Sequence, residues 1–92
     1  MVSAIVLIKV GTGSVTEVAN SLVGLKGVSQ VFSVAGNYDV VALLHVPENE
    51  DLADLVGDGI RKIGGILSTE TLIAFRTYSR TELDAGFSLG ID

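Results

Sequence analysis

The sequence predicts an α+β fold in which two helices cover one face of a four-stranded antiparallel sheet. Two apolar runs, Ser3 to Val10 and Val40 to Val46, are continuous rather than alternating, which is typical of central strands. The order of segments is the second observation, because each half of the chain reads strand, helix, strand, with a period of roughly 37 residues. This split βαβ order is that of the ferredoxin-like βαββαβ sandwich, whose central strands are the first and third.

In the first half, the opening strand ends at a glycine-rich turn, and Ser14 with Glu17 fits a capping box for a helix from about Val15 to Val23. The apolar residues of that helix recur on one face at spacings of three and four. The next segment, Val28 to Ala35, mixes polar and apolar residues less regularly. We therefore predict a strand nearer the sheet edge.

A polar turn precedes the second apolar run, and a hairpin between Val28 to Ala35 and Val40 to Val46 is the natural consequence. Gly36 and Asn37 most easily adopt a positive φ, so the chain can reverse there and present backbone N–H groups. Tyr38 and Asp39 follow at once. A carboxylate beside a glycine turn at the mouth of a buried strand is a reasonable anchor for a ligand.

In the second half, Pro47 ends the pairing, and acidic residues with a capping Asn49 predict the start of another helix. Two glycines, Gly57 and Gly59, weaken that helix by about 1 kcal/mol each relative to Ala. A final strand is predicted from Ile66 to Phe75. The apolar stripe of the predicted helix comprises Leu52, Leu55, Val56, Ile60 and Ile63.

Composition limits the function classes. Ninety-two residues make one domain, which buries only about 60 to 65 % of its unfolded surface. A net charge of −5 gives no basic stripe for phosphates, so we expect no direct binding of nucleic acid. The absence of cysteine excludes disulfides and thiolate chemistry and suits a cytoplasmic location. The apolar opening is shorter than the roughly 20 residues that cross a bilayer, so we expect no membrane segment.

The two central strands also predict self-association. Two helices cover only one face of a four-stranded sheet, so an apolar opposite face must be buried by something outside the chain. The simplest solution is the same face of a second copy, which gives a homodimer of the dimeric α/β barrel type. We expect 1–76 to form the domain and 77–92 to form a C-terminal extension that packs on a partner subunit.

Two motifs carry a family resemblance, namely Gly36-Asn37-Tyr38-Asp39 and the run from Gly64 to Thr71. With the strand order, they make the chain resemble a stand-alone RAM domain, the effector-binding domain of the Lrp/AsnC transcriptional regulators. The resemblance implies an amino-acid pocket between dimers, a ring of dimers, and indirect action through a DNA-binding relative, because the usual helix-turn-helix segment does not precede the motif. The implied ligand-binding residues are Gly36, Asn37, Tyr38, Asp39, Ser68, Thr69 and Thr71.

The expected function is therefore a non-catalytic regulatory module that binds a free amino acid or similar metabolite, without a cofactor. Strand alternation puts Thr69 and Thr71 on one face and Ser68 on the other, which limits how many hydroxyls reach one ligand. One alternative is a small dimeric α/β-barrel enzyme of monooxygenase or isomerase type, although His45 is the only histidine and no second His or Cys completes a metal site with it. Another alternative is a purely structural assembly subunit.

Overall fold

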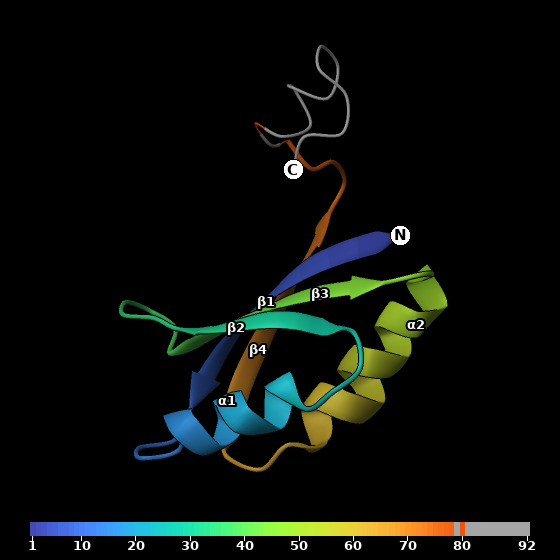
Figure 1. The fold of residues 1–92 in the computed structure, drawn as a ribbon. Coiled ribbons are helices and arrows are strands. Elements are labelled where there is room, and N and C mark those ends of the chain that lie inside the picture. The colour runs from blue at the N-terminus through green and yellow to red at the C-terminus, as the bar shows by residue number, and fades with distance from the viewer. Residues whose placement is uncertain (79, 81–92) are drawn as a thin grey trace.

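A computed structural model describes residues 1–78 and 80 of the chain (Figure 1). The four strands form one sheet in the order β2-β3-β1-β4, and every neighbouring pair is antiparallel. The predicted ferredoxin-like fold is confirmed, with β1 and β3 at the centre. The elements are β1 (Val2–Val10), α1 (Val15–Val23), β2 (Val28–Ser33), β3 (Val40–Val46), α2 (Asn49–Asp54), a π-helical turn (Leu55–Gly59), a 3-10 turn (Ile60–Lys62) and β4 (Ile66–Ala74).

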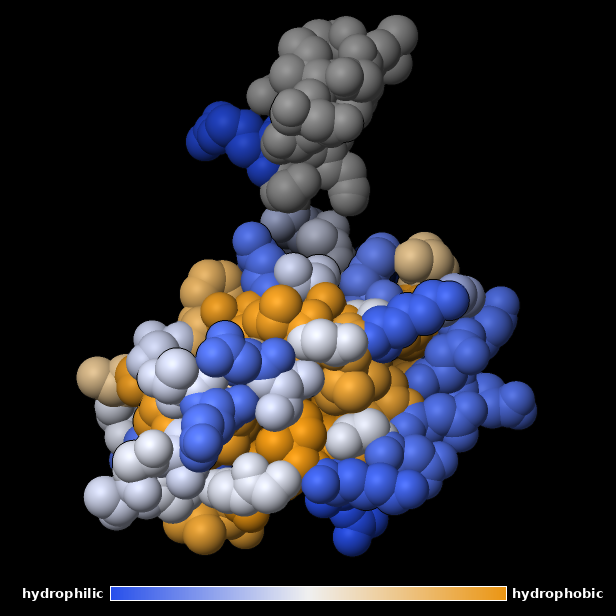
Figure 2. All heavy atoms as spheres, turned by 60° about the horizontal axis from the view of Figure 1, so that its bottom comes forward, coloured by the Kyte–Doolittle hydropathy of each residue, from blue (hydrophilic) through white to orange (hydrophobic). Residues whose placement is uncertain are grey.

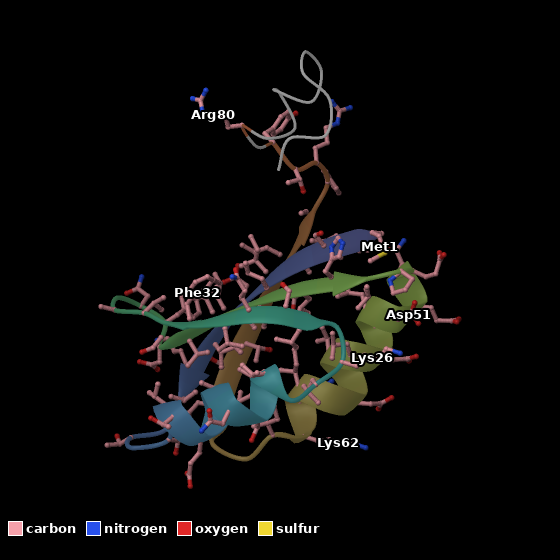
Figure 3. The ribbon with its side chains drawn as sticks, viewed as in Figure 1. Met1, Lys26, Phe32, Asp51, Lys62 and Arg80 are labelled. Carbon is pink, nitrogen blue, oxygen red and sulfur yellow. The ribbon has the colours of Figure 1, made fainter. Side chains whose placement is uncertain are left out.

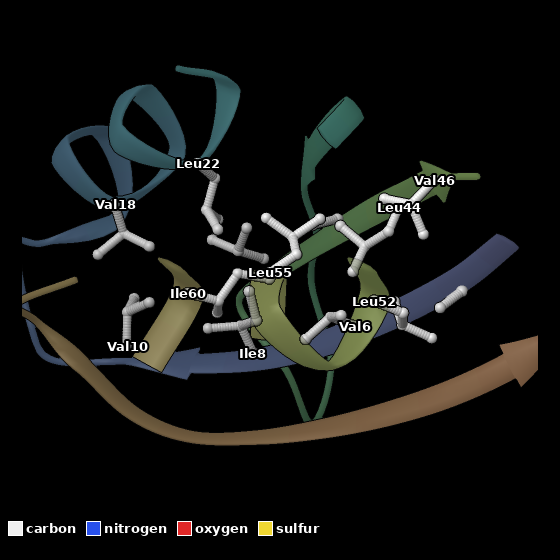
Figure 4. Packing of buried hydrophobic residues seen from close by; sticks show 13 residues of the cluster. Val6, Ile8, Val10, Val18, Leu22, Leu44, Val46, Leu52, Leu55 and Ile60 are labelled. Carbon is white, nitrogen blue, oxygen red and sulfur yellow. The ribbon is translucent and has the colours of Figure 1, made fainter. Parts of the chain in front are cut away.

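The core lies between the sheet and the two helices, which lie on the same side of it (Figure 1). Alternate residues of β1 and β3 point to this side, and the pairing of Val6 with Ala42 places them together under the helices. Figure 4 shows these side chains interdigitating with those of the helical segments. The buried cluster comprises Ala4, Val6, Ile8, Val10, Val18, Leu22, Val40, Ala42, Leu44, Val46, Leu52, Leu55 and Ile60.

The opposite face of the sheet is apolar and open in the single chain. Of the residues of β1 and β3 that alternate with the buried ones, Leu7, Val41 and Leu43 lie on this face half-buried, and Ile5 is exposed. The two outer strands contribute Phe32 and Leu72, which are exposed. We predict from the sequence that both faces of the central strands are buried. In the single chain this face is uncovered, so its burial requires a partner. We call it the open face, with Ile5, Leu7, Phe32, Val41, Leu43 and Leu72 as its apolar residues.

Both predicted helix caps differ in the structure. Ser14 stands at the N-cap of α1 but makes no hydrogen bond with its side chain, because its ψ of 1° is far from the extended backbone that places a hydroxyl over the first turn. Before α2, the N-cap is Glu48 rather than Asn49, which is already helical. The Glu48 N–H donates to Asp51 Oδ2 at 3.0 Å.

The second helix changes its winding part-way. After Asp54, the segment Leu55–Gly59 is π-helical, and the Ile60 N–H donates to the Leu55 carbonyl five residues earlier. The extra residue in this turn lets Leu55 and Ile60 face the same core. Gly59 closes the turn against Leu25, whose side chain would lie 3.4 Å from an added Cβ, so this glycine marks close packing.

Three smaller outcomes complete the fold. The strand predicted to reach Ala35 ends at Ser33, and the strand predicted to reach Phe75 ends at Ala74. Within the described residues, no helix is long and apolar enough to cross a membrane. The predicted extension over 77–92 lies mostly outside the residues that the structure describes.

Candidate functional site

The turn between β2 and β3 is fastened to the end of β1 by hydrogen bonds that centre on Asp39. The Val34 N–H donates to the Asp39 carbonyl at 3.0 Å, and the Asp39 N–H donates to the Ile8 carbonyl at 2.9 Å. The Asp39 carboxylate accepts from the Val10 N–H at 3.0 Å through Oδ2, in a partly buried position. Asp39 therefore has a structural role, because it satisfies a backbone donor beside the bulge in the pairing of β1 with β4.

At the tip of this turn, Gly36 has a φ of 127°, which favours glycine over any residue with a Cβ. A Cβ built on Gly36 meets nothing within 4 Å, so the tip projects into solvent. Asn37 beside it is also exposed. The predicted reversal at a glycine is confirmed, and the tip is accessible to a ligand or to another subunit.

Tyr38 links the turn to the other edge of the sheet. Its phenol donates to Glu70 Oε1 at 2.6 Å, a short hydrogen bond of the charge-assisted kind. Since Glu70 pairs with Leu7 and lies on the open face, the tyrosine reaches across β1 on that face. Three effects raise the pKa of Tyr38 above its ordinary 10.0: the hydrogen bond to Glu70 first, then desolvation, then the charge of Glu70.

The register of β4 separates the predicted hydroxyl residues. Thr69 pairs with Ile8 and Thr71 pairs with Val6, so both point to the helix side of the sheet. Ser68 pairs with Lys9 and lies on the open face with Glu70. The predicted alternation is confirmed, and it brings only Ser68 to the same face as Tyr38.

Glu70 is the residue of this constellation that sequence reasoning missed. It lies between two of the predicted positions, Thr69 and Thr71, and shares the alternation of Ser68. That alternation was a usable signal. The missing information was the register of β4 against β1, which places the carboxylate within reach of Tyr38.

Two cavities on the helix side stand out among the described residues, and the Gly36 turn lines neither of them. One, of about 670 Å³, opens between α2 and the end of β4 and includes Thr71, Ile73 and Leu52. The other, of about 580 Å³, lies at the far end of β3. In the same part of the chain, no group of three or more His, Asp or Glu side chains could hold a metal ion.

His45 is hydrogen-bonded to the neighbouring strand β1. Its Nδ1 lies 2.8 Å from the Ser3 hydroxyl on the neighbouring strand, near the surface. The pairing of Ser3 with His45 in the register of β1 and β3 accounts for this contact.

Comparison with known proteins assigns the family. The family model of the Lrp/AsnC ligand binding domain matches residues 3–83. The chain belongs to this family. The resemblance that rested on the Gly36 turn and the last strand is thereby confirmed.

The relatives of this chain in the Lrp/AsnC family include transcriptional regulators and proteins of known structure. The HTH-type transcriptional regulator FL11 of Pyrococcus abyssi is 35 % identical over 78 residues, which are 85 % of this chain and 51 % of the regulator. The crystal structure of TTHA0845 from Thermus thermophilus is 41 % identical, with a TM-score of 0.81, and the match covers 87 % of this chain and 100 % of that one. The chain spans about half the length of the curated relatives it matches.

One similar structure contains an amino acid. A feast or famine regulatory protein from M. tuberculosis, complexed with L-methionine, is 29 % identical, with a TM-score of 0.71. The match covers 87 % of this chain and 54 % of that protein. The ligand-binding domain of this family thus occurs in regulators, and that member has been captured with an amino acid.

Proposed function

We propose that the chain binds a free amino acid, or a similar small metabolite, at the Gly36 turn and acts as a non-catalytic regulatory module. The supporting observation is the fastening of this turn, an exposed tip held on one side by Asp39 and on the other by Tyr38. A relative with the same fold is complexed with L-methionine. The proposal gives ligand roles at this turn to Gly36, Asn37, Tyr38, Asp39 and Ser68. It does not include Thr69 and Thr71, because both point to the helix side of the sheet.

The chemistry of the turn suits a zwitterion. A carboxylate needs donors, and backbone N–H groups at a glycine turn supply them. An ammonium needs an acceptor, and the Asp39 carboxylate has a second oxygen beside the one that accepts from Val10. The open tip leaves room for a second subunit to close the pocket, so in this proposal the site is completed by assembly.

Assembly is the second part of the proposal. The open face pairs with the same face of another copy to form a homodimer, because it carries apolar residues on all four strands and no helix of the described residues covers it. By family resemblance, the dimers associate into a ring and meet a DNA-binding Lrp/AsnC relative. A cytoplasmic location is part of the proposal, and the kinship with transcriptional regulators supports it.

Thermal shift with the twenty amino acids, followed by calorimetry on those that stabilise the protein, tests the proposal. Asp39→Asn removes the charge and keeps an oxygen that can accept from the Val10 N–H, so it separates binding from folding. We expect an affinity about ten- to hundred-fold weaker, the value of a charge-assisted hydrogen bond of about 1.5 to 3 kcal/mol.

Asp58→Asn is the matched control, since Asp58 is exposed in the π-helical turn and far along the chain from the proposed site. Its affinity should equal that of the native chain. Unchanged affinity in Asp39→Asn would remove Asp39 from the site. A full panel without any stabilising amino acid would favour a purely structural subunit, and conversion of a bound amino acid to a product would favour the enzyme.

A further inference from the structure

The cavity of about 580 Å³ lies at the end of β3 opposite to the Gly36 turn. Its size falls within the range of about 300 to 1,000 Å³ that is usual for small-molecule sites. The floor is apolar, with Val46 and Leu55 buried and Pro47 beside them. An apolar floor of this kind accommodates an aliphatic side chain of a ligand.

Positively and negatively charged side chains surround this apolar floor. The Lys26 ammonium comes from the loop after α1, and the Asp51 and Asp54 carboxylates come from α2. In the part of the chain that the structure describes, these groups line the cavity without forming an ion pair with one another. Figure 3 shows Lys26 and Asp51 on the α2 side of the molecule, and Figure 2 shows hydrophilic side chains gathered on that side next to apolar ones.

The wall that carries Lys26 is fixed in place. Gly27 has a φ of 101°, and a Cβ on it would lie 2.9 Å from the side chains of both Leu55 and Val46. Only glycine lets the backbone approach the floor this closely. The His45 N–H donates to the Gly27 carbonyl at 2.8 Å and ties the loop to β3. The acidic wall is fixed as well, because Asp51 accepts from the Glu48 N–H.

We propose that this cavity is a second binding site, for a zwitterionic amino acid with an apolar side chain. The ligand carboxylate pairs with Lys26, its ammonium pairs with Asp54 and the remaining oxygen of Asp51, and its side chain rests on Val46 and Leu55. β3 has seven residues and separates this site from the Gly36 turn by roughly 20 Å. The inference stands without the function proposed for that turn.

A titration of the isotope-labelled protein with L-norleucine, followed by nuclear magnetic resonance, measures binding at the two sites separately through the chemical shifts of their amides. The glycine amides report them independently, with Gly27 and Gly59 beside the cavity and Gly36 in the turn. We expect saturable shifts at Gly27 and Gly59. Shifts confined to Gly36 would overturn the cavity site and support the ligand site proposed at the turn. Shifts confined to Gly27 and Gly59 would support the cavity site and count against the site at the turn.

Two ligand fragments test the recognition of both charges. Pentylamine lacks the carboxylate of norleucine, and hexanoate lacks its ammonium. If both charged walls are used, each fragment should bind about ten-fold or more weakly than norleucine at Gly27 and Gly59. Equal binding of hexanoate and norleucine would overturn the role of the acidic wall, and equal binding of pentylamine would overturn that of Lys26.

Substitutions with matched controls complete the test. Lys26→Met and Asp54→Asn should each weaken the norleucine shifts at Gly27 about ten- to hundred-fold, with a native melting temperature. Lys62→Met and Asp58→Asn remove the same charges from exposed positions that do not line the cavity, and they should bind as the native chain does. Native binding in both cavity variants would overturn the proposal.

Discussion

At the residue scale, Asp39 combines a structural contact with a proposed ligand contact, and two substitutions separate them. Asp39→Ala removes the acceptor of the partly buried Val10 N–H, so we expect a loss of about 1 to 3 kcal/mol in the free energy of unfolding. Asp39→Asn should lose clearly less, since its side-chain oxygen can still accept. Urea unfolding of both variants measures the difference. Equal losses would mean that the charge, rather than the acceptor, stabilises the turn.

The hydrogen bond between Tyr38 and Glu70 predicts that the folded chain loses stability at alkaline pH. The phenol donates only while protonated, and its pKa is raised above 10.0 in the folded chain. The stabilisation is therefore fully present below pH of about 10 and is lost as the pH rises through the raised pKa. Spectrophotometric titration in a Tyr78→Phe background isolates Tyr38, because the chain has two tyrosines.

In that background, Glu70→Ala should lower the pKa of Tyr38 to its ordinary value. Glu17→Ala is the control, since Glu17 is an exposed carboxylate on α1, and it should leave the titration unchanged. A pKa of Tyr38 that stays raised without Glu70 would show that burial, rather than the carboxylate, causes the shift.

Single residues also show how far the sequence predicts the site. Gly36 could be assigned to a turn from local chemistry alone, because a positive φ is a property of the residue and its neighbours. The partners of Tyr38 and Asp39 could not be assigned in this way. Glu70 lies 32 positions after Tyr38, and Val10 lies 29 before Asp39, so both contacts depend on strand register. Local sequence does not determine register at this level of detail.

At the element scale, the absent side-chain cap of α1 leads to a test. Replacing an N-cap serine with alanine usually costs about 1 kcal/mol, because a capping hydrogen bond is lost. Ser14 makes no such bond, so Ser14→Ala should change the free energy of unfolding by less than about 0.5 kcal/mol. Denaturant unfolding measures it. A loss of about 1 kcal/mol or more would indicate that the predicted capping box forms in solution.

Two glycines with positive φ in different loops, Gly13 before α1 and Gly27 before β2, give contrasting predictions. Gly13→Ala introduces a Cβ into open space, so it should cost only the backbone strain of about 1 to 2 kcal/mol. Gly27→Ala adds contacts at 2.9 Å with Leu55 and Val46, and overpacking costs about 1 to 3 kcal/mol more. Melting temperatures of the two variants compare them directly. Equal losses would show that the loop shifts to make room.

Elements with one clear periodicity were predicted best. α1 and β3 have the predicted bounds. Helical spacing identifies α1, and the apolar run of β3 is short and lies between the Gly36 turn and Pro47, which favours a strand. The second helix was harder. Leu55 and Ile60 are both buried although they are five positions apart, a spacing that suits a π-helical turn. Leu55, Val56 and Ile60 together also fit the apolar stripe of an ordinary α-helix, so the sequence does not reveal the change to π-helical winding.

At the scale of the whole molecule, the open face predicts self-association at micromolar concentration. The face continues over all four strands, and a small domain gains stability by burying it against a copy of itself. Light scattering should give a mass of at least twice 9.6 kDa. Leu7→Asp places a charge at the middle of the face, where pairing would bury it without a partner, so this variant should be monomeric.

Val23→Asp is the matched control for the dimer, because it replaces an apolar residue that is 61 % exposed on α1, away from the open face. It should keep the native mass, and both variants should keep the native circular dichroism, since neither residue belongs to the buried cluster. If Val23→Asp alone dissociates the protein, the helix side is the interface. A light-scattering mass of a monomer for the native chain would contradict the predicted self-association through the open face.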